Sequence, residues 1–438
     1  MAKALDQIRV LDFSWSVAGP TVTQIMAAHG AEVIKVEWPT HADPMRTSMF
    51  AVDTPATLDS GAFFSTLNIG KDSLTLNVGT EPGRDVIRRL IAASDVVVES
   101  FSAGMMRRWG FDYQTMSGLN PGIIYLSVSG FGHSGPYERY ETWGPTAQAF
   151  NGLTASSGLP GREPAGWGYS YMDVCAGYLG AVALFAALHQ RHTSGQGQYI
   201  DVAQTEAGLA LTGAAMLDAD VNQRTTERPG FPPGNRAIWP GVPNGHGLRG
   251  EVGAPYGLYP TLGGGLNDYC AITVLNQTQW EALVQASGQS AWGSDQRFAS
   301  HQSRVRYQTA LDQAIGQWTE TIDKYQLMDR LQAAGVPAGA LQSASDLMER
   351  DPQLAARQVF VELDHPRLGR HRYESIPIKY SASPVAYEPK WPLLSSSNQP
   401  VLHDVAGLSD EAINQLNQLG ITWPESLERD ALIEGSLW

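Results

Sequence analysis

The sequence predicts an α/β fold in which a large, doubly wound, Rossmann-like domain is joined to a smaller α+β domain. Two observations lead to this prediction. Apolar strand patterns alternate with helix patterns through the first half of the chain, and residues 228–255 are then rich in proline and glycine. Regular alternation of strands and helices is typical of a parallel sheet with helices on both faces and ligand loops at the carboxyl ends of its strands.

The first three predicted elements form a βαβ unit. Residues 8–13 are predicted to form a strand, residues 20–29 a helix that begins at a proline, and residues 32–37 a second strand. Such a unit joins parallel strands. The alternation continues with strands at residues 73–78, 95–99, 122–129 and 198–202 and helices at residues 83–93, 173–192 and 204–217.

A second, smaller set of elements follows the proline- and glycine-rich stretch. It comprises strands at residues 256–260 and 269–274 and helices at residues 277–286, 304–318 and 324–334, and a last helix is predicted at residues 409–419. The predicted organisation is therefore residues 1–219 as the first part of the large domain, residues 220–255 as a linker, residues 256–345 as the small domain, and residues 346–438 as a second linker and a segment that returns to the large domain.

The composition argues against several classes of protein. Of the 438 residues, 43% are hydrophobic and 17% are charged, and no apolar run has the length of a membrane span. The formal net charge of −14 argues against a nucleic-acid or anionic-membrane partner. The first residues lack the layout of a signal peptide, so we expect a cytoplasmic protein. Cys175 and Cys270 are too few for a disulfide framework or a metal cluster, and we expect no metal.

The loop after the first strand argues against a dinucleotide-dependent enzyme. It reads SWSVAGP at residues 14–20, whereas nicotinamide-cofactor enzymes hold the pyrophosphate with G-x-G-x-x-G at this place. A modified loop could still bind a phosphate or an adenine.

Asp173 opens a long helix of small residues, which reads DVCAGYLGA at residues 173–181. A carboxylate in the first turn lies at the positive end of the helix dipole, which favours its ionised form. An ionised carboxylate beside small residues can act as a nucleophile and form a covalent acyl intermediate. The alternative is that Asp173 only caps the helix. Cys175 points to a different face, and we interpret it as a core residue rather than a reactive thiol.

Six motifs occur together in one order. They lie at residues 8–20, 30–37, 95–101, 127–132, 173–181 and 195–198. In this order, and over nearly the whole chain, the sequence resembles the family III CoA-transferases, also called the carnitine/bile-acid type. The resemblance implies an enzyme that moves coenzyme A (CoA) from an acyl-CoA to a carboxylic acid. CoA is then a substrate, and no cofactor is bound permanently.

The resemblance also implies a covalent route through Asp173. In the family, the aspartate that opens this helix attacks the acyl-CoA carbonyl and forms a mixed anhydride and a CoA thiolate. The thiolate returns to give an aspartyl-CoA thioester, from which the acceptor carboxylate takes CoA by the reverse steps. Neither ATP nor a metal is needed, but water must be excluded because both intermediates hydrolyse. Family members form interlocked dimers, so we expect a homodimer.

The CoA-contacting positions of the family fall in the first βα loop and at the ends of predicted strands. Arg46 and Arg108 match residues that would hold the CoA phosphates, although Arg107 and Arg108 could equally form an exposed basic helix end. The positions implied by the resemblance are Trp15, Val17, Ala18, Arg46, Leu76, Asn77, Gly79, Ser100, Phe101, Ser102, Arg108, Trp109, Ser129, Gly130, Phe131 and Gly132.

Four of these positions depart from the pattern of some relatives. A family lysine falls at Gly79 and another at Ser129, so two cationic contacts to CoA are missing. Formyl-CoA transferases carry a histidine and a glutamine where this chain has Trp15 and Val17, which argues against a formyl or oxalyl substrate. Aromatic residues favour a branched or aryl-substituted acceptor such as a substituted succinate, with succinyl-CoA as donor; these residues are Trp15, Trp143, Trp167, Tyr169 and Tyr171.

Three alternatives compete with a CoA-transferase made of this chain alone. The α-methylacyl-CoA racemases share the scaffold and the aspartate but need a second base, usually a histidine in a Gly-His-Asp motif. Trp143 stands near that place and cannot accept a proton, while His133 lies in the preceding Gly-Phe-Gly loop. The chain could also be the catalytic subunit of a heteromer, because it retains Asp173. A nucleotide-binding regulatory protein is disfavoured, because the sequence supplies no DNA-reading element.

Overall fold

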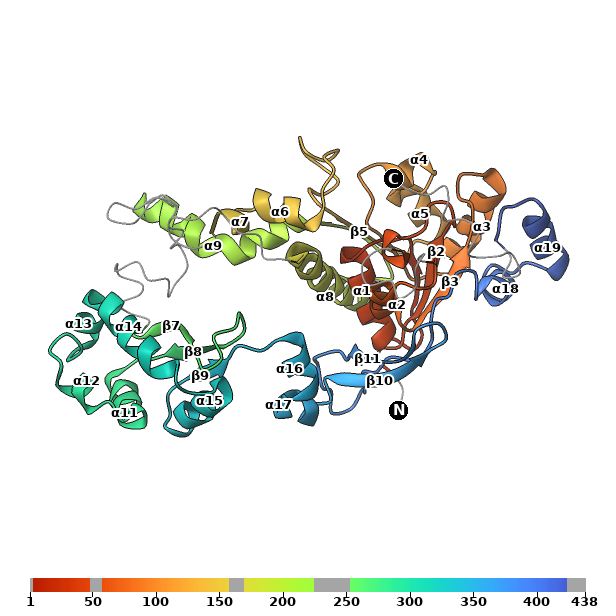
Figure 1. The fold of residues 1–438 in the computed structure, drawn as a ribbon. Helices are drawn as coiled ribbons and strands as arrows, with labels where there is room; N and C mark the ends of the chain where they lie inside the picture. The colour runs from red at the N-terminus through yellow and green to blue at the C-terminus, as the bar shows by residue number, and fades with distance from the viewer. Residues whose placement is uncertain (1–2, 48–56, 157–168, 224–252, 424–438) are drawn as a thin grey trace. The chain divides into compact units, whose positions relative to one another are not determined.

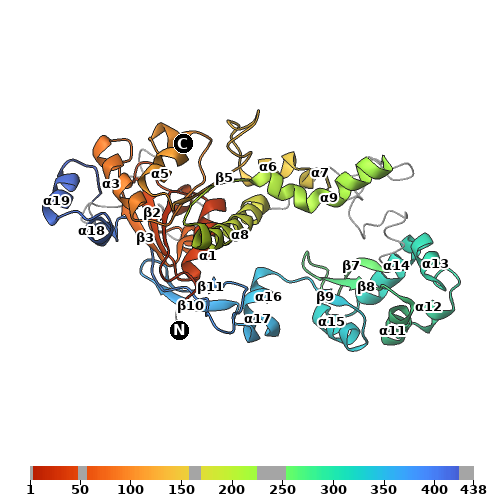
Figure 2. The same cartoon turned by 180° about the vertical axis from the view of Figure 1, so that it is seen from behind.

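The computed structural model describes residues 3–47, 57–156, 169–223 and 253–423 (Figure 1 and Figure 2). Contacts divide the chain into two compact units. Unit 1 comprises Met1–Thr154, Ala165–Gly213 and Gln358–Trp438, and unit 2 comprises Ala155–Pro164 and Ala214–Arg357. Most of the predicted 220–255 linker, at residues 224–252, lies outside the described residues.

Unit 1 is built on a six-stranded parallel sheet, which confirms the predicted α/β class. Its strands are β1 (Arg9–Asp12), β2 (Glu32–Glu37), β3 (Lys71–Thr75), β4 (Val96–Glu99), β5 (Ile124–Ser129) and β6 (Tyr199–Ala203). They lie in the order β3-β2-β1-β4-β5-β6, so the chain reverses its direction across the sheet between β1 and β4. Open α/β sheets bind their ligands at such a switch point, beyond the carboxyl ends of the strands.

Helices cover both faces of this sheet. Successive residues of a strand point to opposite sides, so Val10 and Val96 face one layer while Leu11 and Val97 face the other. The first layer is formed by α1 (Ala18–Ala28) and α8 (Tyr171–Ser194), and the second by α3 (Glu81–Ala92), α5 (Tyr113–Leu119) and α19 (Asp410–Gln418). Among the described residues, α8 alone is long and apolar enough to cross a membrane, with a mean hydropathy of 1.6. It packs against α1 and β5, as the core helix of a globular domain does.

The C-terminal segment adds a last layer of contacts to unit 1. Gly70 N donates to Lys390 O over 2.8 Å, and Ser397 N donates to Ser73 O over 3.0 Å. Both contacts hold this segment beside β3. The other elements that begin in unit 1 are η1 (Pro44–Arg46), α2 (Ala62–Asn68), α4 (Met105–Arg108), α6 (Gly144–Phe150), α7 (Leu153–Ser156), α9 (Gln204–Asn222), the hairpin β10 (Phe360–His365) and β11 (Gly369–Glu374), α18 (Asn398–Pro400) and the π-helical turn η2 (Val401–Val405).

Unit 2 combines a small antiparallel sheet with short helices. The sheet order is β7-β8-β9, and its core encloses Cys270, which is fully buried. The elements are β7 (Tyr256–Pro260), β8 (Tyr269–Thr273), α11 (Gln277–Ser287), α12 (Ser290–Ser294), α13 (His301–Arg306), α14 (Gln308–Thr319), α15 (Lys324–Ala333), β9 (Ala338–Ala340), α16 (Ala344–Glu349) and α17 (Pro352–Ala356).

Several element boundaries differ from the prediction. The strand predicted at residues 73–78 is β3, which ends at Thr75. The helix predicted at residues 304–318 is interrupted at Tyr307, whose φ of −102° and ψ of 27° lie outside the helical region. The helix predicted to start at Asp173 starts at Tyr171, so Asp173 is its third residue. The sequence pattern shows which side chains are apolar but not where the backbone turns.

Candidate active site

Asp173 lies at the buried start of α8, where its side chain is only 8% exposed. Glycine allows this helix to approach α1 closely, because a Cβ at Gly177 would lie 2.7 Å from Thr21 Cβ and 3.0 Å from Ala18 O. Ser170 is the N-cap of α8, and its carbonyl accepts a hydrogen bond from Asp173 N over 3.1 Å. The small residues noted in the sequence therefore place Asp173 beside the helix that follows the first strand loop.

Two neighbouring elements hold the Asp173 carboxylate. Gln204, the first residue of α9, donates from Nε2 to Asp173 Oδ1 over 3.1 Å. Gly144, the first residue of α6, lies so close that an added Cβ would collide with Asp173 Oδ2 and lie 2.6 Å from Ser170 Cβ. A side chain at position 144 would therefore displace the carboxylate.

Burial raises the pKa of Asp173 to about 6 from the ordinary value of 3.8, while hydrogen bonds from Ser170, Gln204 and its own backbone act in the opposite direction. A pKa near 6 leaves roughly ten ionised carboxylates for each protonated one at pH 7. The group is therefore mostly charged but poorly solvated at neutral pH. A carboxylate in this condition is suited to attack an electrophilic carbon.

Three of the predicted CoA-contacting residues form a continuous aromatic row at the switch point. The Trp15 and Phe101 rings meet edge-to-face at 5.2 Å, and Phe101 meets Trp109 in the same way at 5.4 Å. Ser100, in the loop after β4, is hydrogen-bonded to Trp15, in the loop after β1. The Ser100 hydroxyl accepts from Trp15 N over 2.9 Å and donates to Trp15 O over 3.2 Å. The loops after β1 and β4 are thus brought together as the parallel sheet requires.

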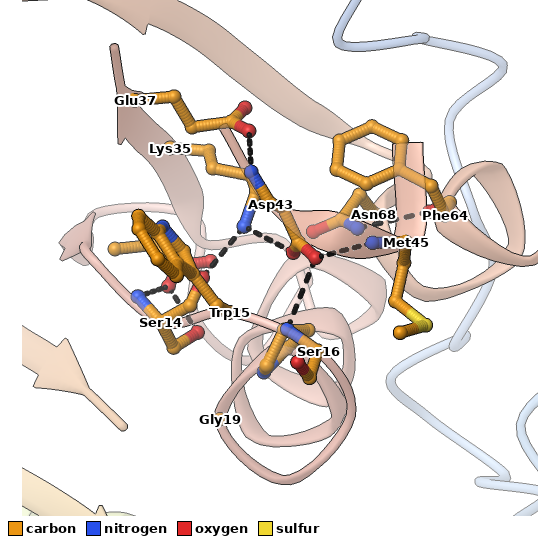
Figure 3. A network of polar contacts seen from close by, with 12 residues as sticks. Ser14, Trp15, Ser16, Gly19, Lys35, Glu37, Asp43, Met45, Phe64 and Asn68 are labelled. Atoms are coloured by element: carbon orange, nitrogen blue, oxygen red, sulfur yellow. Dashed lines mark hydrogen bonds and ion pairs between the residues drawn. The ribbon is translucent and has the colours of Figure 1, made fainter. Parts of the chain in front are cut away.

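A buried ion pair supports the first of these loops (Figure 3). Lys35 Nζ donates to Ser14 O over 2.6 Å and lies 3.3 Å from Asp43 Oδ2. Asp43 Oδ1 accepts from Ser16 N over 3.1 Å and from Met45 N over 3.0 Å. Ser16 has a φ of 63°, a left-handed conformation that few residues other than glycine adopt without support. Burial opposes the charge of Lys35, but Asp43 and other carboxylates outweigh it and raise the lysine's pKa.

A pocket of about 80 Å³ lies beside the nucleophile candidate. Gln204, which contacts Asp173, is part of its wall. Ser129 Oγ and Gln204 Oε1 are buried there, and neither has a hydrogen-bond partner within the part of the chain that the structure describes. Six predicted CoA-contacting residues line the pocket, namely Ser100, Phe101, Ser102, Ser129, Gly130 and Phe131.

The two arginines predicted to hold the CoA phosphates have different surroundings. Arg46 is 1% exposed, and its guanidinium pairs with Glu37 over 2.7 Å and with Asp59 over 3.0 Å. These carboxylates occupy its donors, so Arg46 supports the fold and we do not retain it as a phosphate ligand. Arg108 is exposed at the end of α4, where Nη2 contacts Met105 Sδ. Arg108 is therefore accessible to a phosphate.

Some of the other predicted residues are buried in the core next to the site, and others are exposed around it. Val17 and Ala18 are buried at the start of α1. Leu76 is buried after β3, and Asn77 N donates to Ile421 O over 2.8 Å. Gly79 is exposed, Gly132 has a φ of 78°, Trp143 is the exposed N-cap of α6, and Tyr169 and Tyr171 flank Ser170; Trp167 lies outside the described residues.

Three groups that the sequence did not identify are prominent in the structure. Gln204 and Gly144 reach Asp173 from other helices, and the Lys35–Asp43 pair supports the loop that holds Trp15. A signal for Gln204 was available, because it directly follows β6 and so lies at the carboxyl edge of the sheet. Within the described ranges, His, Cys, Asp and Glu side chains do not gather in threes as metal ligands would.

Solved structures share this fold. A CAIB/BAIF family protein from Brucella suis superposes with a TM-score of 0.79 and 29% sequence identity, covering 92% of this chain and all of its own. A protein from Mycobacterium tuberculosis has a TM-score of 0.73 over 91% of this chain and 98% of its own. At 24% identity the second likeness concerns the fold alone.

Curated relatives are similar over almost their whole length. Succinyl-CoA–D-citramalate CoA-transferase of Chloroflexus aurantiacus is 34% identical over 94% of this chain and 97% of its own. Formyl-CoA:oxalate CoA-transferase of Streptomyces coelicolor is 33% identical over 96% and 99%, respectively. Residues 5–398 match CoA-transferase family III. The chain therefore belongs to the family III CoA-transferases and is a CoA-transferase.

Proposed function

We propose that the enzyme transfers CoA from succinyl-CoA to a substituted dicarboxylic acid through covalent intermediates on Asp173. The observation that carries the proposal is the Asp173 carboxylate itself, which is buried, mostly ionised at neutral pH and held beside a pocket. A cap that served only the helix would gain nothing from burial, whereas a nucleophile benefits from the exclusion of water.

The steps balance without a redox partner or a net proton transfer. An Asp173 oxygen attacks the thioester carbon, the C–S bond breaks with its electron pair on sulfur, and a mixed anhydride forms. The thiolate then attacks Asp173 Cγ, expelling the donor carboxylate and leaving an aspartyl-CoA thioester. The acceptor carboxylate attacks the same carbon and releases the thiolate. Finally the thiolate attacks the acceptor's acyl carbon and regenerates the Asp173 carboxylate.

The first loop supports the choice of donor and acceptor. Trp15 packs on Phe101 in a place where formyl-CoA transferases carry a smaller polar side chain, so a formyl or oxalyl group is not the substrate we propose. The similar Chloroflexus enzyme is named for succinyl-CoA and D-citramalate, a hydroxylated dicarboxylate. We therefore propose succinyl-CoA as donor and a methyl- or hydroxy-substituted succinate as acceptor.

CoA binding is assigned to the switch-point loops. The aromatic row of Trp15, Phe101 and Trp109 offers faces and edges for the adenine, and exposed Arg108 offers a cation for a phosphate. Racemisation lacks comparable support. Among the described residues, no histidine is found among the groups that shift the pKa of Asp173, and His133 instead lies 3.3 Å from Phe101 O and 3.6 Å from Glu99.

Trapping of the covalent intermediate tests the proposal. The protein is incubated with succinyl-CoA, treated with hydroxylamine or borohydride, and analysed by intact and peptide mass spectrometry. We expect an adduct on the Asp173 peptide that is absent from Asp173→Ala and Asp173→Asn. The Glu206→Gln variant, which removes an exposed carboxylate from the first turn of neighbouring α9, should label normally. Labelling of Asp173→Ala at an unchanged level, or undiminished thioester exchange by it, would refute the covalent route.

A further inference from the structure

The two ends of the Gln204 carboxamide lie in different surroundings. Nε2 donates to Asp173 Oδ1 over 3.1 Å, and Oε1 is buried without a partner in the described chain. The orientation of the amide is determined by chemistry, because an ionised carboxylate can only accept hydrogen bonds and the NH2 group must therefore face it. The side chain is 7% exposed, so few other arrangements are open to it.

Gln204 is also one of the residues that line the pocket of about 80 Å³. Ser129, whose Oγ is likewise buried and unpartnered within the described residues, forms another part of the same wall. A buried polar atom without a partner is costly, so two in one small pocket indicate a polar ligand group that satisfies both. An amide fits, because its N–H can donate to Gln204 Oε1 and its carbonyl can accept from Ser129 Oγ.

The thioester-bearing arm of CoA carries such amides close to its sulfur. We propose that Gln204 is a positioning residue that accepts a hydrogen bond from an amide of this arm and at the same time holds the Asp173 carboxylate for attack. This inference rests on the proposed function of Asp173 and deepens it. It makes correct placement of the nucleophile depend on the presence of CoA in the pocket.

Few charged groups near Asp173 could shift the pKa of its carboxylate. Helices α1 and α6, which pack on α8, have no ionisable side chain, and no charged residue is among the causes of the raised pKa of Asp173. Burial raises the pKa of Tyr169 to about 12, and the charge of the Asp173 carboxylate adds to this shift. The ionisable groups on the other neighbouring elements are Tyr125 on β5, Tyr199 and Asp201 on β6, and Glu206, Asp218 and Asp220 on α9.

The test uses Gln204→Leu and Gln204→Glu, with Thr212→Val as the matched control. Thr212 is buried on the same helix, and its Oγ1 donates to Asn151 O over 3.2 Å, away from Asp173. The readouts are single-turnover acylation of Asp173 by succinyl-CoA on both sides of pH 6, binding of free CoA by calorimetry, and the melting temperature.

We expect Gln204→Leu to slow acylation at neutral pH by about 10- to 100-fold, the usual cost of a lost hydrogen bond to a charged group. The acid limb of its pH profile should move to higher pH, because the lost hydrogen bond favoured the ionised carboxylate. In Gln204→Glu a second carboxylate faces Asp173 and should move the limb further. Binding of free CoA to Gln204→Leu should weaken by about 2- to 10-fold, since a neutral hydrogen bond is lost. Thr212→Val should leave all three readouts close to those of the unmodified protein.

The outcomes separate this inference from the function on which it rests. Undiminished transfer by Asp173→Ala would refute the nucleophile itself. If Asp173→Ala is inactive but Gln204→Leu keeps the rate, pH limb and CoA affinity of the unmodified protein, the positioning role of Gln204 is refuted. An equal loss of acylation in Thr212→Val would also overturn it, because the effect would then belong to the stability of α9.

Discussion

At the scale of single residues, the buried Asp173 carboxylate opposes the stability of the fold that encloses it. Its carboxylate is removed from water and receives too few hydrogen bonds to restore the ordinary pKa. Since the pKa is higher in the folded than in the unfolded chain, ionisation of Asp173 destabilises the folded state. The penalty is absent below the unfolded pKa of 3.8, grows as the pH rises, and is complete above about pH 6.

Asp173→Asn is therefore expected to stabilise the enzyme while abolishing transfer. The asparagine keeps an oxygen that can accept from Gln204 but carries no charge, so about 2 to 3 kcal/mol should be gained at pH 7. Thermal unfolding should show a higher melting temperature for the variant at neutral pH, with the difference vanishing near the ordinary aspartate pKa of 3.8. Glu206→Gln, which removes an exposed carboxylate, is the control and should melt at the temperature of the unmodified protein. If Asp173→Asn melts at or below the temperature of the unmodified protein at pH 7, this prediction is wrong.

Arg46 illustrates what residue type alone does not reveal. Its position near a predicted ligand loop favours a phosphate ligand, but Glu37 and Asp59 enclose its guanidinium. These carboxylates lie 9 and 13 positions away in the sequence. Pairing over such separations depends on how β2 and the following loop fold back, which no local pattern specifies.

At the scale of elements, the site depends on close contact between α1 and α8. Both helices cover the same face of the sheet; α1 begins just after the Trp15 loop, and α8 begins at Tyr171, two residues before Asp173. Glycines at the contact bring the helix axes together, so Asp173 and the Trp15 loop share one corner of unit 1. A larger residue would separate them.

Gly177→Ala tests this packing. The added methyl group would lie 2.7 Å from Thr21 Cβ, closer than atoms normally approach, so we expect a loss of about 1 to 3 kcal/mol in unfolding free energy. Gly118→Ala is the matched control, because Gly118 is exposed on α5 with no atom within 4 Å of the added Cβ. That variant should be more stable by about 0.5 to 1 kcal/mol. Chemical denaturation measures the unfolding free energies of both variants. If Gly177→Ala is as stable as Gly118→Ala, the result argues against close packing of α1 on α8.

At the scale of the whole molecule, the family assignment and the sheet topology agree. The reversal of strand order between β1 and β4 places ligand loops where doubly wound folds bind their substrates. Relatives that match the chain over nearly its whole length are CoA-transferases with different named acids. The common scaffold is therefore consistent with CoA transfer in all of them, and our proposal places the choice of acid in loop residues such as Trp15.

The family resemblance predicts that the chain works as a homodimer. Light scattering after size exclusion should give about twice the chain mass of 47.4 kDa, at the protein concentration used in the assay. The purified chain should also transfer CoA without any other protein. A monomeric mass, or activity that appears only after a second, different subunit is added, would contradict the homodimer and favour the heteromer.

The sequence by itself determined the alternation that produces the parallel sheet, the apolar layers of its two faces and the position of Asp173 near the start of a small-residue helix. These features are local, because strand and helix periodicity and helix-start signals act over a few residues. The tertiary structure alone decided that Gln204 reaches Asp173 across 31 positions and that carboxylates enclose Arg46. It also showed that Lys35 and Asp43 support the Trp15 loop. Hydrogen bonds and ion pairs depend on side-chain distances of a few ångströms, and these are set by how separate elements pack together.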